Sequence, residues 1–139
     1  MTAYLHSSAL IKLVIDEAGR DTVIEHLASS DGLVATVPAA RVEVAAALAR
    51  ARHAGRLSAD EAWQAWSELL TTWSDLVVLR VDDSILEQAG VLALRHALGA
   101  GQAVHLAAAV SVPILRPFLS FDAALNRAAR AEELWVPGA

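Results

Sequence analysis

Short runs of β-forming residues alternate with helical patterns along this chain of 139 residues. Strands are expected at residues 2–6, 33–36, 76–81, 117–121 and 134–136. Most of these runs are separated by segments that have the composition of helices. Parallel neighbouring strands need long crossover connections, which are usually helices. The alternation therefore predicts an α/β fold with a mostly parallel central sheet flanked by helices.

Several of the expected helices carry start signals. Ser7 or Ser8 is expected to cap a helix that runs to about residue 16, and Pro38 suits the first turn of a long helix ending near residue 55. The segment from Ser58 to Glu61 has the spacing of a capping box. The other helices are expected at 20–29, 58–73, 82–98, 102–111 and from 122 onwards. The run 76–81 is rich in Val and Leu and predicts a buried strand.

Length and hydropathy fit one domain that spans residues 1–139, long enough to bury most of its apolar surface. Hydrophobic residues make up 55% of the chain, but Arg, His or Pro interrupts every long apolar stretch. No membrane span is therefore expected. The first residues, MTAYLHSSAL, have no basic region followed by an apolar one, so no secretory signal is expected either. These features favour a cytoplasmic location.

Charge and cysteine content restrict the partners and the metals. The net charge of −5 is the wrong sign for nucleic-acid binding by bulk attraction, so any RNA contact must be local. The absence of cysteine excludes disulfides and thiolate zinc sites. One basic concentration is expected on a single helix, where a solvated helix face is favoured over an RNA contact; it comprises Arg41, Arg50, Arg52, His53 and Arg56.

Candidate functional residues follow two of the expected strands. His6 and Asp122 each end a strand and open a helix, and ligands of parallel sheets collect at the carboxyl ends of strands. Asp122 also suits a helix N-cap. Glu43 stands among Val and Ala, where an unpaired carboxylate is costly, so it needs either a functional role or an ion pair with a nearby Arg.

Four segments carry a family resemblance: YLHSSALIKL at 4–13, RVEV at 41–44, GQAVHLAAA at 101–109 and LSFDAAL at 119–125. In this order and at these separations they resemble the PIN-domain family, most closely the VapC-type toxins of bacterial toxin–antitoxin pairs. There the segments read roughly YLDSSALVKL, RVEV, GDAIHLA and TFDxxL. The resemblance covers nearly the whole chain and implies a PIN-like three-layer α/β/α sandwich.

The resemblance also implies a chemistry. In the family, four clustered acids hold Mg²⁺ or Mn²⁺ for RNA cleavage, and the matching positions here are His6, Glu43, Gln102 and Asp122. Glu43 and Asp122 remain as the implied metal ligands, while His6 and Gln102 replace acids. The formal charge of the site falls from about −4 to about −2, which weakens the support for two metal ions. A VapC-like protein whose catalysis is weakened or lost is therefore expected.

Two alternatives remain open. The first is an active endoribonuclease in which Glu43 and Asp122 hold one metal and His6 is a ligand or general base, since imidazole suits Mn²⁺ or Zn²⁺ better than Mg²⁺. The second is a non-catalytic protein that binds an antitoxin or RNA. His105, one helical turn after Gln102, is expected to be packed or hydrogen-bonded, with metal ligation as the less favoured alternative.

Large apolar side chains form one stripe on the expected helix 58–73, namely Trp63, Trp66, Leu70 and Trp73. Core packing is the default interpretation of such a stripe. Aromatic anchors also dominate many protein interfaces. The resembling toxins form homodimers and hold a segment of a cognate antitoxin among their early helices, so the resemblance implies both partners and makes this stripe a candidate contact.

Overall fold

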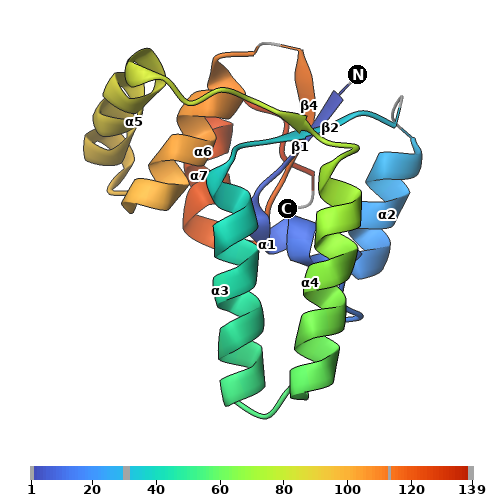
Figure 1. Ribbon diagram of the computed structural model, residues 1–139. Coiled ribbons are helices and arrows are strands. Elements are labelled where there is room, and N and C mark those ends of the chain that lie inside the picture. The colour runs from blue at the N-terminus through green and yellow to red at the C-terminus, as the bar shows by residue number, and fades with distance from the viewer. Residues whose placement is uncertain (1, 30–31, 113, 138–139) are drawn as a thin grey trace.

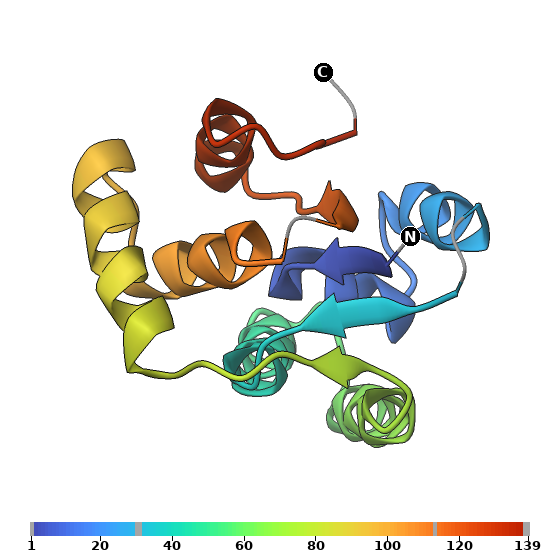
Figure 2. The same ribbon diagram turned by 90° about the horizontal axis from the view of Figure 1, so that it is seen from above.

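A four-stranded sheet lies at the centre of the molecule. The computed structural model describes residues 2–29, 32–112 and 114–137. The strands are β1 (Thr2–Leu5), β2 (Val34–Thr36), β3 (Val77–Val78) and β4 (Leu115–Leu119), and their order across the sheet is β3-β2-β1-β4. Every neighbouring pair is parallel, which confirms the α/β prediction. Figure 1 labels β1 and β2, and Figure 2 shows β1 and β2 between the two edge strands.

Helices cover both faces of the sheet, as the view from above shows (Figure 2). In chain order they are α1 (Ser7–Leu10), the 3₁₀ helix η1 (Ile11–Leu13), α2 (Arg20–Ala28), α3 (Ala39–His53), α4 (Ala59–Trp73), α5 (Asp83–His96), α6 (Ala100–Val110) and α7 (Ala123–Ala131). The described chain is therefore a three-layer α/β/α arrangement.

Two hydrophobic clusters hold these layers together, and β1 contributes to both. Tyr4 packs into a cluster with residues of α5, α6 and α7, while Ala3 and Leu5 pack into a second cluster with residues of α1 to α4. Successive side chains of a strand point to opposite faces, so a strand covered on both faces, as β1 is from Ala3 to Leu5, carries consecutive buried side chains. The three side chains are 0% exposed.

Local capping chemistry positions several helices as the sequence predicts. Ser58 and Glu61 form both hydrogen bonds of a capping box at the start of α4. Asp82, at the start of α5, accepts from the backbone N–H of Ile85. Each bond satisfies a backbone donor that the first helical turn leaves free.

The first helix and two strands differ from the sequence predictions. The expected helix 7–16 is shorter, because α1 ends at Leu10 and continues only as η1. The expected buried strand 76–81 is reduced to β3, which lies at the sheet edge with Val77 and Val78 41% and 38% exposed. Residues 134–136 form no strand; the carbonyl of Trp135 accepts one hydrogen bond from the N–H of Phe118.

The α3–α4 hairpin projects beyond the sheet (Figure 1). Trp66 and Trp73 pack against the second hydrophobic cluster, which confirms core packing for part of the predicted stripe. Trp63 and Leu70 are 66% and 44% exposed, so the stripe is not buried throughout.

All five residues of the predicted basic concentration are exposed, although Arg56 lies beyond the end of α3. Within the described segments, no helix has the length and apolar character needed to cross a membrane.

Candidate functional site

A cleft of about 560 Å³ opens where β1 and β4 end and where α3 and α6 pass the same edge of the sheet. His6 follows β1 and Asp122 precedes α7, whereas Glu43 is on α3 and Gln102 is on α6. All four predicted site residues line this cleft. The topology brings them together because the carboxyl ends of parallel strands meet at one edge.

His6 lies at the inner end of the cleft and is 7% exposed. It is the N-cap of α1, since its Nδ1 accepts from the backbone N–H of Ser8 at 3.2 Å and also contacts the Ser8 hydroxyl at 2.9 Å. The expected capping serine is therefore wrong: His6 is the cap and Ser8 is its partner. Burial, together with His105, lowers the pKa of His6 from 6.5 to about 4, against the opposing effect of Glu43 and Asp122.

Glu43 is held by a buried chain of side-chain contacts. Nε2 of His105 lies 2.6 Å from Oε1 of Glu43, and Nδ1 of His105 lies 2.7 Å from the Tyr4 hydroxyl. With the imidazole proton on Nε2, His105 donates to Glu43 and accepts from Tyr4. Burial raises the pKa of Glu43, but the hydrogen bond and charge of His105 with the charge of His6 lower it overall. The partner of Glu43 is thus a histidine, not the Arg considered from the sequence.

Gln102 and Asp122 form the second linked pair. The amide nitrogen of Gln102 donates to Oδ2 of Asp122 at 2.7 Å, and its amide oxygen accepts from the backbone N–H of Gly99 at 2.7 Å. Oδ1 of Asp122 accepts from the backbone N–H of Leu125, which confirms the predicted cap of α7. Ser120 completes the set, because its hydroxyl accepts from the Asp122 N–H at 3.0 Å.

These contacts set the protonation of Asp122. Burial raises the pKa of Asp122, but the hydrogen bonds from the Leu125 backbone and from Gln102, with the charge of His6, lower it overall. Asp122 is therefore an anion whose two carboxylate oxygens both accept hydrogen bonds from the protein. An aspartate at position 102 would have no N–H with which to make the bond that Gln102 makes.

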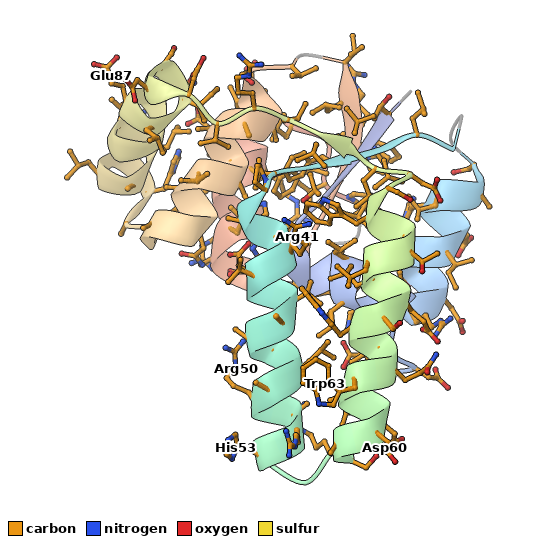
Figure 3. The ribbon with its side chains drawn as sticks, viewed as in Figure 1. Arg41, Arg50, His53, Asp60, Trp63 and Glu87 are labelled. Carbon is orange, nitrogen blue, oxygen red and sulfur yellow. The ribbon has the colours of Figure 1, made fainter. Side chains whose placement is uncertain are left out.

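Two further features shape the cleft. A Cβ built on Gly101 would lie 3.0 Å from Oε2 of Glu43, so the glycine lets α6 approach the carboxylate. Arg50 lines the cleft from α3 and is exposed; its side chain points away from α4 (Figure 3). Sequence reasoning assigned neither residue to the site. The Gly99-Ala100-Gly101 sequence at the start of α6 predicted only a turn that leads into this helix.

The comparison with protein families agrees with this architecture. The PIN domain family model matches residues 3–131, which is nearly the whole chain. The chain therefore belongs to the PIN-domain family, generally a family of metal-dependent nucleases. No curated protein matches the chain. PIN domains typically depend on a divalent metal ion.

The residues present do not fit the four-acid Mg²⁺ site that the family implies. Mg²⁺ prefers oxygen ligands in octahedral geometry. At two of the four positions the cleft presents the imidazole of His6 and the amide nitrogen of Gln102, which points at Asp122 instead of leaving that carboxylate open. Both carboxylate oxygens of Asp122 therefore already accept hydrogen bonds from the protein. A different grouping is available among the described residues, where His6, Glu43 and His105 each bring one donor atom within 4.8 Å of the others.

Proposed function

We propose that this PIN-domain protein is a VapC-like member of a toxin–antitoxin module in which Mg²⁺- or Mn²⁺-dependent RNA cleavage is weakened or lost. The observation that carries the proposal is the hydrogen bond between Gln102 and Asp122. It places a neutral donor where a hydrolytic metal needs a carboxylate, since such ions are fixed by hard oxygen ligands before they polarise a phosphate.

The state of Glu43 supports the same conclusion. One of its oxygens accepts from His105, and His6, whose donor atom lies within 4.8 Å, supplies nitrogen and not oxygen. Two carboxylates with separate protein partners remain from the four acids of the resembling toxins. Catalysis through a pair of metal ions requires ligands that act as a unit, so loss of two of them is expected to remove most of the activity.

Reversion of both replaced residues tests the proposal. The wild type and the His6→Asp/Gln102→Asp variant are incubated with a broad panel of structured RNAs in Mg²⁺ and then in Mn²⁺. We expect the double reversion to cleave at least about 100-fold faster than the wild type, because loss of even supporting groups costs about 10–100-fold at metal sites. The matched control adds Glu43→Gln to the reverted protein and should abolish the gain.

Two outcomes contradict the proposal. Rapid cleavage by the wild type that Glu43→Gln removes would identify an active endoribonuclease with the present residues. A double reversion that binds Mn²⁺ tightly but cleaves no RNA would indicate that the replaced acids are not what limits the activity.

The partners in this proposal are a cognate antitoxin and a second copy of the chain. An apolar groove of about 360 Å³ lies between α3 and α4, and its lining includes Leu48, Trp66 and the 66% exposed Trp63. Trp63 points between the two helices (Figure 3). Such a groove supports the binding of an apolar antitoxin segment, because aromatic anchors contribute most of the energy in many interfaces.

The outer side of α5 supports association with a second copy. Leu86, Val91 and Leu94 are 50%, 52% and 90% exposed, so α5 offers apolar side chains that a second copy would bury. Light scattering of the wild type and of Leu94→Asp should give a dimer mass for the first and a monomer mass for the second. A monomer mass for the wild type across the micromolar range would contradict the homodimer.

A further inference from the structure

Three side chains from distant parts of the sequence converge at the cleft, which His6 and Glu43 line and behind which His105 is buried. His6 ends β1, Glu43 comes from α3 and His105 from α6, and one donor atom of each lies within 4.8 Å of the other two. The rings of His6 and His105 meet edge to face with centroids 4.5 Å apart. His6 is 7% exposed and His105 is 0% exposed, so the imidazoles are held away from bulk water.

This donor set has the chemistry of a borderline metal site. Two imidazoles and one carboxylate form the three-protein-ligand set of many zinc sites that keep a fourth position open, whereas Mg²⁺ prefers oxygen alone. We propose that His6, Glu43 and His105 bind a single borderline divalent cation of the Zn²⁺ or Co²⁺ class in place of the Mg²⁺ pair of the family. The proposal does not depend on whether the protein cleaves RNA.

The contacts behind the two imidazoles fit this role. Nδ1 of His6 lies 2.9 Å from the Ser8 hydroxyl, and Nδ1 of His105 lies 2.7 Å from the Tyr4 hydroxyl. Histidines that ligate a metal through one nitrogen usually donate a hydrogen bond from the other, which fixes the ring. A hydroxyl can accept as well as donate, so each ring can carry its proton on Nδ1 and present Nε2 to the ion.

Binding requires local rearrangements at both histidines. Nε2 of His105 and Oε1 of Glu43 are 2.6 Å apart and joined by a hydrogen bond in the metal-free protein, so the His105 proton must move to Nδ1 before Nε2 can bind an ion. Two ligands of one tetrahedral zinc ion are about 3.3 Å apart, given bonds of about 2.0 Å. Glu43 can make this shift, because its side chain is 30% exposed and faces the cleft. The Ser8 N–H bond to His6, at 3.2 Å, is lost when Nδ1 takes the proton.

The charge of the trio suits one ion. Glu43 contributes one carboxylate, which offsets part of the charge of a divalent cation, and the two imidazoles bind as neutral ligands. The cleft gives the ion access to water for its remaining coordination positions.

The test uses Co²⁺ as a spectroscopic probe on the full-length protein without a histidine tag. Four-coordinate Co²⁺ absorbs strongly in the visible range, whereas the hydrated six-coordinate ion absorbs weakly. We expect a strong visible band at one equivalent of Co²⁺, its displacement by one equivalent of Zn²⁺, and no displacement by millimolar Mg²⁺. The chain has no cysteine and so no thiolate that competes for the probe.

Two ligand variants and one control assign the site. His6→Asn keeps a good helix N-cap but removes the ring, and Glu43→Gln keeps the shape but removes the charge. We expect each to weaken Co²⁺ binding at least about 10-fold, as loss of groups at metal sites does. His53→Ala, at the exposed end of α3, should bind as the wild type does. Circular dichroism measures whether each variant is folded. If one variant is unfolded, the Co²⁺ affinity of the other tests the site.

Three results would overturn the proposal. A wild type that gives only the weak six-coordinate spectrum, or Zn²⁺ binding that both ligand variants retain, would exclude the trio as a site. Displacement of Co²⁺ by millimolar Mg²⁺ would do so as well, because an N₂O donor set does not select Mg²⁺.

Discussion

Two histidine–carboxylate pairs in this molecule have nearly the same contact distance but different surroundings. His105 and Glu43 meet at 2.6 Å in the cleft, and His96 and Glu132 meet at 2.7 Å where α5 approaches the end of α7. The ring of His105 is completely buried and its second nitrogen contacts Tyr4. Glu132, in contrast, also accepts from Arg95, whose side chain is 54% exposed.

The two pairs have different roles. At the α5–α7 contact, Glu132 is shared between His96 and the half-exposed Arg95, and solvent screens the arginine part of the interaction. In the cleft, the buried His105 ring, which contacts no Lys or Arg among the described residues, orients the Glu43 carboxylate toward the cleft. The buried His105 ring makes hydrogen bonds at both nitrogens that water cannot replace, so its removal costs more.

The largest effect is expected from His105→Ala. It leaves a cavity and removes the buried contacts that His105 makes with Tyr4 and Glu43, so we expect a loss of about 3–5 kcal/mol in the free energy of unfolding. His96→Ala should cost only about 1 kcal/mol, since Glu132 keeps Arg95 and water. Urea denaturation of both variants measures the difference. Equal losses would break the distinction between the two pairs.

Acid should weaken the cleft through His6, with the metal-free protein kept in chelator. The unfolded chain protonates this ring near pH 6.5 and the folded chain near pH 4, so the unfolded state binds more protons between these values. Stability should therefore fall by up to about 3 kcal/mol as the pH drops from 6.5 to 4. His6→Asn should flatten this part of the curve and His53→Ala should not. An unchanged curve for His6→Asn would exclude His6 as its source.

Gln102→Asp should have a smaller effect. It removes the amide donor to Asp122 and adds a like charge, so we expect a loss of about 1–2 kcal/mol in chelator. Millimolar Mn²⁺ should restore part of the loss by bridging the two carboxylates. Gln102→Ala is the matched control, because it removes the bond without adding a charge and should not respond to Mn²⁺. Thermal unfolding with and without the ion gives both comparisons.

The smallest effect is expected from Arg95→Ala. The ion pair with Glu132 is half-exposed on the arginine side, and such pairs contribute about 0–1 kcal/mol. The loss should shrink further in high salt, because salt screens exposed charges. Urea denaturation at low and high ionic strength measures it. A loss above that of His96→Ala, independent of salt, would identify Arg95 as the main partner of Glu132.

Elements whose signals are local could be predicted from the sequence. The capping box from Ser58 to Glu61 and the Asp122 cap were predicted correctly, because each bond joins groups three residues apart. The predictions failed where an element depends on its neighbours. Residues 134–136 have strand-like composition but a single backbone bond to β4, and the run 76–81 keeps only two strand residues at the open edge of the sheet.

The sequence also determined that His6, Glu43, Gln102 and Asp122 meet, because the β–α alternation and the family motifs together specify the edge of the sheet. The hydrogen-bond partners of these side chains depend on the tertiary structure. Glu43 and His105 are 62 residues apart, Gln102 and Asp122 are 20 apart, and Tyr4 and His105 are 101 apart. A hydrogen bond forms within about 3 Å, so its partner follows from how α3, α6 and α7 pack and not from any local pattern.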